Sequence, residues 1–408
     1  MGSDVISVTE AKRLILAAVK PLPAVSCDLA DACGRVLAAD VVSPFPLPLH
    51  DNSAMDGYAL RSADTEQASD NNPLSLTVIG VIAAGESTHG LPPLLPTQAV
   101  QIFTGAMVPP GANAVIRQED VTIHGGQIVL TRPVRPKESL RFKGEEVGEG
   151  DTVLTAGEVL SPAGIGVLAS LGLKSVQRAT RPRVGILVTG SEIVTDFIHL
   201  QPGKIFDSNS HVLTAALQRM GLPPVFRKSC VDDRETLRQT IGDGLAKCDV
   251  LLVTGGVSVG KFDHVKEVSA ELGIEEIFWK VRQKPGKPLF FGSTKDGQKL
   301  LFGLPGNPAS VLVCFYQYVY PALMKAMGAT EPFLASAHVG LHKDFAKPPG
   351  LTHFLKARLT AGGTVEILER QGSHMMSSFA RANCLAAIDE AVTDLRKGDM
   401  VEIHLLPL

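Results

Sequence analysis

The chain has 408 residues, more than one hydrophobic core usually organises, so two to four domains are expected. Charged residues make up 20% of the chain and hydrophobic residues 45%, as in ordinary folded proteins. The net charge of −3 argues against the broad basic face of a nucleic-acid-binding protein, although it leaves a local cationic pocket open.

The cysteines and the apolar stretches indicate the compartment. The six cysteines are scattered and none has zinc-site spacing, which is typical of buried thiols in a reducing compartment. The N-terminus has no basic region followed by an apolar run, so no signal peptide is expected. The most apolar long stretch, 311–327, contains Gln317, Pro321 and Lys325 and predicts a buried helix rather than a membrane span. We therefore expect a cytoplasmic protein with no membrane partner.

In the first part of the chain, the predicted secondary structure changes twice, from helix to short strands and back to helix. Ser7 and Glu10 form a capping-box pattern ahead of apolar residues at helical spacing, which predicts a helix from Ser7 to Val19. Alternate prolines over 44–48 then predict a domain crossing. The short runs LTVIGVI, AVQIF, AVIRQ and QIVL are separated by glycine and proline, which predicts a small β domain before helical texture returns near 163.

From 183 to 327, apolar strands alternate with helical segments. The strands RVGILVTG, DVLLVTGG and KLLFGLPG, with helices near 212–220 and 237–245, predict an open, mostly parallel sheet. Ligands bind such sheets at the carboxyl ends of the strands, where the loops TGSE, TGGVSVGKFD and GLPGNP follow. The later segments AHVGLH, THFLKARL, TVEILER and MVEIHLLPL predict a small C-terminal β domain.

The loop TGGVSVGKFD carries paired glycines directly after a buried strand. Gly255 and Gly256 would let backbone amides approach an anion closely, and Asp263 would lie at the same mouth. A tight strand–helix turn capped by Asp263 explains the local pattern about equally well.

The loop GLPGNPAS predicts a helix start. Asn307 suits the N-cap and Pro308 the first helical position, so free N–H groups could face a phosphate or oxyanion. A well-made helix start without a ligand is the stronger interpretation of this loop alone.

The loop KPGKP holds two lysines between prolines. Lys284 and Lys287 are thereby placed on a stiff backbone, and rigid cations lose less entropy when they bind a polyanion. A solvated surface turn remains the alternative, but it does not explain the flanking prolines.

Several acidic or polar residues are ambiguous on their own. Asp56 precedes Gly57, and Thr104 ends the AVQIF strand. Glu192 follows the glycine turn after the strand RVGILVTG. Each of these residues is therefore either a turn residue or a site residue. Asp232 and Asp233 precede a helix and are expected partly to cap it.

The motifs are specific in combination. NSAMDGYA, TGA, RFKGEE, LVTGSE, TGGVSVGKFD, KPGKP, GLPGNPAS and QGSHMMSS, in this order over roughly 7–405, resemble the molybdopterin molybdenumtransferase family, which includes MoeA proteins and the E domain of gephyrin. The resemblance implies a multi-domain α/β plus β fold. Its parts are a discontinuous N-terminal domain (7–44 and 146–179), an inserted β domain (45–145), a doubly wound molybdopterin-binding α/β domain (180–328) and a C-terminal β barrel (329–408).

The resemblance also implies an activity and a site. Family members are homodimers that insert molybdate into adenylated molybdopterin with Mg²⁺ and release AMP, in a cleft between the α/β domain of one subunit and the inserted domain of the other. The implied catalytic set is Asp56, Thr104, Glu192, Asp232 and Asp263, with Glu192 and Asp263 as metal ligands. The implied substrate-binding set is Arg141, Gly255, Gly256, Ser258, Lys284, Lys287, Pro305, Asn307, Pro308, Lys356 and Ser373.

Two positions depart from the family pattern. Glu146 stands where aspartate is usual, and its carboxylate reaches one methylene further. Lys356 stands where many relatives carry arginine, so charge is kept but bidentate recognition of an oxyanion is lost.

Two other functions compete with this one. A molybdopterin adenylyltransferase resembles the α/β domain alone, and the additional domains disfavour it. A non-catalytic molybdopterin-binding scaffold would not need the acidic set. As partners, the resemblance implies a second copy and transient contact with the adenylyltransferase and with cofactor-carrying proteins.

Overall fold

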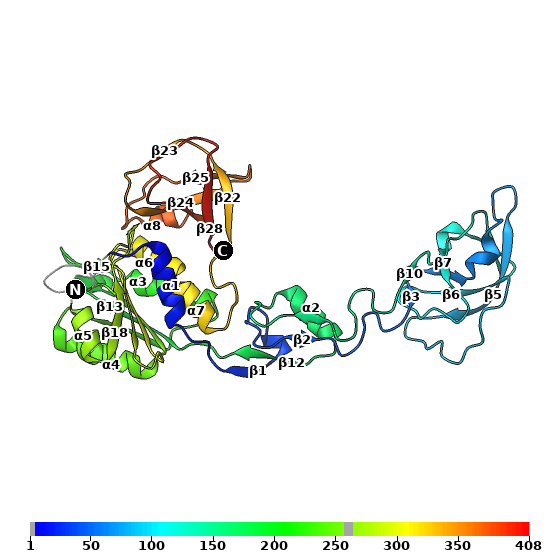
Figure 1. Ribbon diagram of the computed structural model, residues 1–408, viewed down its shortest axis with the longest axis horizontal. Coiled ribbons are helices and arrows are strands. Elements are labelled where there is room, and N and C mark those ends of the chain that lie inside the picture. The colour runs from blue at the N-terminus through cyan, green and yellow to red at the C-terminus, as the bar shows by residue number, and fades with distance from the viewer. Residues whose placement is uncertain (1–4, 257–263, 408) are drawn as a thin grey trace. The chain divides into compact units, whose positions relative to one another are not determined.

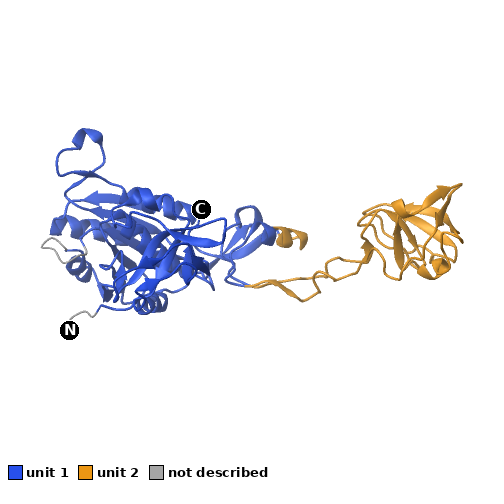
Figure 2. Cartoon of the chain, turned by 90° about the horizontal axis from the view of Figure 1, so that it is seen from above, with its two compact units in different colours: residues 1–39, 156–165, 174–408 blue, residues 40–155, 166–173 orange. Residues whose placement is uncertain are grey.

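The computed structural model describes residues 5–256 and 264–407, so the expectations for Ser258 and Asp263 lie outside the described residues. The chain divides into two units (Figure 2). Unit 1 contains Met1–Ala39, Ala156–Ile165 and Lys174–Leu408, and unit 2 contains Asp40–Thr155 and Gly166–Leu173.

Unit 1 is built around a six-stranded sheet. Its strands, in order, are β16 (Phe226–Cys230), β13 (Val184–Thr189), β17 (Val250–Thr254), β21 (Leu300–Leu304), β20 (Phe290–Thr294) and β18 (Ile274–Trp279). The first four strands are parallel, which confirms the mostly parallel sheet. The last two are antiparallel to their neighbours and form an edge that the sequence pattern did not indicate.

Helices cover both faces of this sheet (Figure 1). Ile186 and Leu252 face the layer formed by α1 (Val8–Ala18), α3 (Asn209–Arg219), α6 (Pro308–Cys314) and α7 (Tyr320–Ala326). Their neighbours Leu187 and Leu251 face α4 (Arg234–Lys247) and α5 (Val265–Glu271). Because successive strand residues point to opposite faces, continuous apolar strands build two cores, and the predicted doubly wound domain is confirmed.

The first helix forms where the capping pattern predicts it. The Ser7 hydroxyl accepts a hydrogen bond from the Glu10 amide at 3.1 Å, but the Glu10 carboxylate pairs with Arg13, so half of the capping box forms. Ala11 and Ile15 of α1 belong to the same core as the sheet residues. The helix therefore packs with the α/β domain, although its sequence position suggested the N-terminal domain.

The remainder of the N-terminal region pairs across the chain. Strand β1 (Ala24–Asp28) lies antiparallel to β12 (Ser175–Ala179). This pairing joins a segment that precedes unit 2 in the sequence to one that follows it. The predicted helix near 163 forms α2 (Pro162–Ser170).

The apolar stretch 311–327 forms a buried helical rod. A π-helical turn, η5 (Phe315–Val319), connects α6 to α7, and both Phe315 and Tyr318 are fully buried. In residues 5–256 and 264–407, no helix combines the length and the apolarity that a bilayer crossing requires.

The C-terminal strands close into a barrel. The ring order is β24 (Thr352–Leu359), β25 (Thr364–Ile367), β22 (Ser336–Leu341), β28 (Met400–Leu405) and β26 (Cys384–Ile388), and β26 pairs back onto β24. The short β19 (Gln283–Lys284) adds to β24, β23 (Phe345–Ala346) pairs with β27 (Asp394–Leu395), and α8 (Met376–Phe379) precedes β26. The predicted C-terminal barrel is thus confirmed.

Unit 2 contains a second six-stranded sheet. Its order is β7 (Ala114–Arg117), β4 (Gly57–Leu60), β6 (Gln98–Ile102), β5 (Leu74–Ile82), β9 (Gln127–Leu130) and β8 (Thr122–His124), as the predicted β runs require. Short pairs join β2 (Val41–Val42) to β11 (Thr152–Leu154) and β3 (Asn52–Ser53) to β10 (Leu140–Arg141). A Cβ at Gly57 would lie 1.9 Å from the Ile116 carbonyl oxygen, which explains the glycine of MDGYA.

Candidate functional site

A cavity of about 610 Å³ lies at the carboxyl ends of β13, β17 and β21 in unit 1. Its acidic lining residues are Glu192, Asp207 and Asp232, which follow strands or precede a helix. The expected residues Gly255, Gly256, Pro305, Asn307 and Pro308 line the same cavity. The sheet thus brings together loops that are more than 100 residues apart in sequence, as expected for a parallel α/β domain.

The two adjacent aspartates after β16 have separate tasks. The Asp233 carboxylate accepts hydrogen bonds from the Thr236 amide at 2.9 Å and the Thr236 hydroxyl at 2.8 Å, and it caps α4. These bonds, the backbone amide first, hold the pKa of Asp233 below its usual range. Asp232 is left to line the cavity, so the partial capping that the sequence suggested belongs to Asp233.

Two cavity residues were missed from the sequence. The Asp207 carboxylate accepts hydrogen bonds from the amide (2.9 Å) and the hydroxyl of Ser210. The Asn209 side chain donates to the Gly306 carbonyl at 2.8 Å, and this bond ties α3 to the GLPGNP loop. The spacing of Asp207 and Ser210 at a helix start was the available signal, but it predicts a cap equally well.

The glycine turn after β17 brings two strand ends close together. Gly255 has φ +87°, and a Cβ there would lie 2.5 Å from the Thr189 carbonyl oxygen. The neighbouring Thr189 hydroxyl oxygen is buried and has no hydrogen-bond partner among the described residues. The turn thus leaves one buried hydroxyl next to the cavity without a partner among the described residues.

A second cavity, of about 650 Å³, adjoins the first. The two share the lining residues Pro288, Pro305, Asn307 and His374. Lys284, Lys287 and Ser373 line the second cavity, whereas Glu192 and Asp232 line the first. The combined site therefore has an acidic half and a cationic half. His374 was not singled out in the sequence, although it lies within QGSHMMSS.

Buried side chains support the backbone of the KPGKP loop. The buried Gln283 amide donates to the Gly286 carbonyl at 3.0 Å, and the Tyr318 hydroxyl donates to Gln283. Gly286 has φ +87°, and a Cβ there would lie 2.6 Å from the Cys314 sulfur. The side chains of Lys284 and Lys287 remain exposed, so the loop presents two cations on a fixed backbone.

The buried imidazole of His353 lies on β24, paired in register with Lys284. Burial, then Lys347 and Lys284, lowers the pKa of His353 to about 4. Because the folded pKa lies below the unfolded value near 6.5, the stabilisation is complete above pH 6.5 and is lost as the pH falls towards 4.

Acidification should therefore destabilise the wild type more than His353→Gln. We expect a difference of roughly 1–3 kcal/mol between pH 7 and pH 4.5, read from thermal melts of both proteins. Parallel pH profiles would show that His353 is not the responsible group.

The GLPGNP helix start differs in detail from the expectation. Asn307 occupies the N-cap with Pro308 next to it, but the Asn307 amide donates to the Ser373 hydroxyl at 3.0 Å instead of serving the helix. The Ala309 amide donates to the Ser373 carbonyl at 3.0 Å, so this amide is not free for a ligand. The loop around Ser373 therefore docks on the helix start.

Lys356 was expected to bind an oxyanion, but its surroundings in the structure differ from that expectation. Its side chain is buried, and the ammonium donates to three backbone carbonyls, those of Arg370, Gly372 and Met375. Burial lowers the pKa of Lys356. The expected direct contact with an oxyanion does not match this arrangement, because all three ammonium protons already have acceptors.

Unit 2 brings together its own pair of expected residues. The Asp56 carboxylate accepts hydrogen bonds from the Thr104 amide at 2.8 Å and the Thr104 hydroxyl at 2.7 Å. These bonds, the backbone amide first, hold the pKa of Asp56 below its usual range. Arg141 ends β10 with an exposed side chain, and Glu146 follows in the same unit with its amide bonded to the Leu47 carbonyl. Asp56 is thus an exposed, ionised carboxylate of fixed orientation.

The acidic half fits Mg²⁺ only as a partial ligand shell. In the parts of the chain that the structure describes, no group of three His, Cys, Asp or Glu side chains could enclose a metal ion. Mg²⁺ commonly takes one or two carboxylates and completes its shell with waters and substrate phosphates. Glu192 and Asp232, beside the unpartnered Thr189 hydroxyl, offer hard oxygen donors of this kind.

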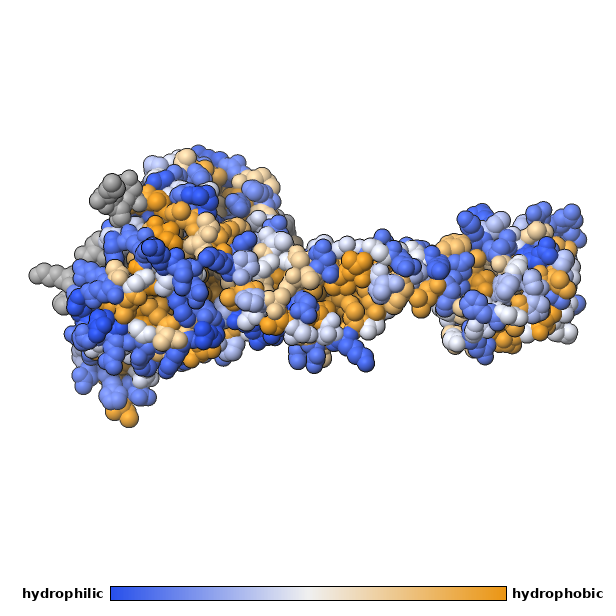
Figure 3. All heavy atoms as spheres, turned by 60° about the horizontal axis from the view of Figure 1, so that its bottom comes forward, coloured by the Kyte–Doolittle hydropathy of each residue, from blue (hydrophilic) through white to orange (hydrophobic). Residues whose placement is uncertain are grey.

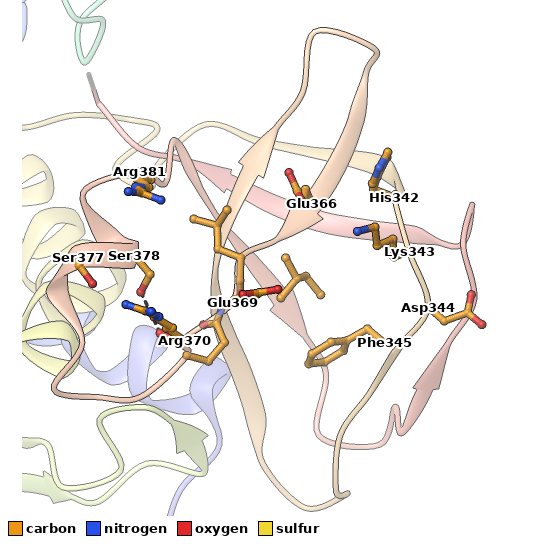
Figure 4. A pocket seen from close by; sticks show the side chains of 13 residues that line it. His342, Lys343, Asp344, Phe345, Glu366, Glu369, Arg370, Ser377, Ser378 and Arg381 are labelled. Carbon is orange, nitrogen blue, oxygen red and sulfur yellow. Dashed lines mark hydrogen bonds between the residues drawn. The ribbon is translucent and has the colours of Figure 1, made fainter.

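A third cavity, of about 670 Å³, opens on the C-terminal barrel (Figure 4). Arg370 and Arg381 lie on one side with Ser377 and Ser378, and Glu366 and Lys343 lie on the other. None of the residues expected from the sequence lines it.

Comparisons with known proteins agree along the whole chain. Three family models match: MoeA N-terminal region (domain I and II) at 6–172, probable molybdopterin binding domain at 185–325, and MoeA C-terminal region (domain IV) at 338–406. The molybdopterin molybdenumtransferase of Staphylococcus aureus is 34% identical over 98% of this chain and 95% of its own length. That of Haemophilus influenzae is 35% identical over 93% of this chain and 94% of its own length.

A solved structure shares the fold. The molybdopterin biosynthesis moeA protein from Pyrococcus horikoshii OT3 superposes with a TM-score of 0.85 at 32% identity, covering 99% of this chain and 100% of that one. Identity above 30% over nearly the whole length, together with the acidic and cationic halves of the site, leads to one conclusion. The chain belongs to the molybdopterin molybdenumtransferase (MoeA) family.

Proposed function

We propose that this chain is a transferase of molybdenum cofactor biosynthesis that inserts molybdate into adenylated molybdopterin and releases AMP. Family membership supports molybdenum insertion into molybdopterin. The observation that carries the assignment to this site is the adjacency of the two cavities, one lined by carboxylates and the other by lysines. An adenylated phosphate with a metal ion suits the first, and an oxyanion such as molybdate suits the second.

Each half of the site contributes to one part of the reaction. Lys284 and Lys287 attract and orient the anionic groups, and Ser373 offers a hydroxyl beside them. Glu192 and Asp232 line the acidic cavity, where they would hold the metal ion and with it orient the anhydride. Mg²⁺, when bound, would offset the charge that develops on the phosphoryl oxygens as AMP leaves. Gly255 and Gly256 let the end of β17 pack closely, because a Cβ would lie 2.5 Å from the Thr189 carbonyl oxygen at the first position and 2.9 Å from the Val265 side chain at the second.

The proposal includes a homodimer whose second copy supplies Asp56 and Thr104. The family resemblance supports this, since it implies a cleft between the α/β domain of one subunit and the inserted domain of the other. Asp56 and Thr104 belong to unit 2, and both cavities lie in unit 1. Polar and apolar residues are interspersed on the face in Figure 3. Phe197 and Ile198, which are adjacent in the chain, are 79% and 90% exposed, and a second copy could cover this apolar pair. A cytoplasmic location and transient contacts with the adenylyltransferase and with cofactor-carrying proteins complete the proposal.

The competing functions are less well supported. Curated relatives match over nearly their full length, which disfavours a molybdopterin adenylyltransferase consisting of the α/β domain alone. A non-catalytic scaffold gives no reason for three carboxylates to line one cavity.

The test combines the purified protein with adenylated molybdopterin, molybdate and Mg²⁺, and measures AMP together with active cofactor. We expect both products, each dependent on the protein and on molybdate. Binding of adenylated molybdopterin without release of AMP would instead establish the scaffold.

Lys287→Ala should weaken anion binding more than it weakens the fold. The exposed side chain contributes little packing, so the free energy of unfolding should change by less than about 0.5 kcal/mol. Loss of one charged hydrogen bond should cost about 1.5 kcal/mol, roughly tenfold in molybdate affinity. Calorimetry with molybdate and a thermal melt separate the two effects. Unchanged affinity with a much lower melting temperature would identify a structural lysine.

A further inference from the structure

Lys356 lies on β24 with only 3% of its surface exposed. Its Nζ donates to the carbonyl oxygens of Arg370 at 2.8 Å, Gly372 at 3.2 Å and Met375 at 3.0 Å. An ammonium group has three N–H donors, and here all three are directed at one segment, residues 370–375. We call this segment the clamped loop.

The main chain of Lys356 and the hydroxyl of Ser378 also bond the clamped loop. Arg370 has φ +60°, an uncommon conformation for a residue with a side chain, and its carbonyl also accepts from the Ser378 hydroxyl at 2.9 Å (Figure 4). The Gln371 side chain bonds the Lys356 amide at 3.0 Å and the Lys356 carbonyl at 2.8 Å. The main chain and the side chain of Lys356 therefore both hold the loop against β24.

The loop in turn forms one wall of the site. Ser373 and His374 line the lysine cavity, and His374 also lines the acidic cavity. At the start of α6, the Asn307 side-chain amide donates to the Ser373 hydroxyl, and the Ala309 backbone amide donates to the Ser373 carbonyl. The connection from Lys356 to the cavity runs through hydrogen bonds from the ammonium to the loop carbonyls, along the loop backbone to Ser373, and through hydrogen bonds from Ser373 to the GLPGNP helix start.

We propose that Lys356 is a positioning residue, which fixes the clamped loop so that Ser373 and His374 face the bound oxyanion, and that it does not contact the oxyanion itself. The proposal rests on the proposed function for the identity of the anion. Charged hydrogen bonds are stronger than neutral ones, and removing one partner leaves buried acceptors unsatisfied. One buried cation can therefore fix a short irregular loop by binding its carbonyls at three points.

Arginine distinguishes the two possible roles. Its five donors lie in one plane and suit a carboxylate or an oxyanion, but they cannot converge on three carbonyls around a single nitrogen. A direct ligand of molybdate should therefore tolerate Lys356→Arg, whereas a loop clamp should not. Lys356→Met removes the donors and keeps the length of the side chain.

The experiment compares full-length Lys356→Met and Lys356→Arg with Lys299→Met as a matched control. Lys299 is half-buried and, like Lys356, donates to a carbonyl, that of Cys248 at 2.7 Å, but it lies just before the amino end of β21. Hydrogen exchange of the clamped loop is measured without substrate, followed by molybdate affinity, KM and kcat.

Both Lys356 variants should increase exchange in 370–375, weaken molybdate binding and raise the KM for adenylated molybdopterin by roughly tenfold, with a smaller change in kcat. Lys299→Met should leave all of these at wild-type values. Wild-type exchange together with lost molybdate binding in Lys356→Met would overturn the proposal, and so would wild-type affinity in Lys356→Arg.

If Lys356→Met does not fold, Lys356→Gln keeps two neutral N–H donors on a shorter side chain and should show the same effects at smaller amplitude. Wild-type exchange in a folded Lys356→Gln, with molybdate binding lost, would equally overturn the proposal. The exchange measurement needs no substrate, so it tests the clamp even if the wild type fails to release AMP. That failure would overturn the proposed function instead.

Discussion

Asp232→Asn should lower the rate of AMP release at limiting Mg²⁺ by roughly 10- to 100-fold. Asp232 lines the acidic cavity and, unlike its neighbour, is not used to cap α4. Asparagine keeps the shape of the side chain but removes the charge that a metal ion needs, so an excess of Mg²⁺ should restore part of the rate. AMP release is measured across a Mg²⁺ titration.

Asp233 provides the matched control, one residue away and of the same type. Asp233→Ala removes the cap of α4 and should lower the melting temperature, while turnover of the folded protein stays near wild type. Asp233→Asn should be nearly silent in both assays, because asparagine caps about as well as aspartate. If Asp233→Asn lost activity and Asp232→Asn kept it, the roles assigned to the two carboxylates would be reversed.

Mixing Asp56→Ala and Asp232→Ala subunits should restore activity that neither variant has alone. If each cleft takes Asp56 from one subunit and Asp232 from the other, a mixed dimer holds one intact cleft and one with both changes. Random exchange makes about half of the dimers mixed, so the mixture should reach about a quarter of the wild-type rate. The rate of AMP release is measured after exchange has been verified by differently tagged subunits.

The control for this experiment mixes Glu192→Ala with Asp232→Ala. Both residues line the same cavity of unit 1, so no mixed dimer should regain an intact cleft. Recovery in this control, or none in the first mixture after verified exchange, would contradict a site shared between subunits.

The sequence predicted the elements better than their long-range partners. The α/β alternation, the β runs of unit 2 and the C-terminal barrel follow from local periodicity, and all of them form. The antiparallel edge formed by β20 and β18 was missed, because an apolar run does not reveal the direction of its neighbour.

The site shows the same limit. Lys284 and Lys287 were found because prolines and glycine mark their loop locally, and they line a cavity as expected. Asp207 and Asn209 were missed, since their polar contacts look like an ordinary helix start until Gly306 is placed beside them. The task of Lys356 depends on carbonyls 14 to 19 residues away, and no residue pattern encodes where main-chain oxygens converge.

The packing of α1 has a consequence for synthesis on the ribosome. Its residues Ala11 and Ile15 share a core with Phe315 and Ala322, about 300 residues later in the chain. At 5 to 20 residues per second, the first helix therefore waits about 15 to 60 s for its binding surface to be translated. During that time its apolar stripe has no native partner, and the α/β core closes only when the nascent chain has passed α7. Ribosomes stalled shortly before α7 should thus present α1 to chaperones and proteases, and those stalled well after it should not.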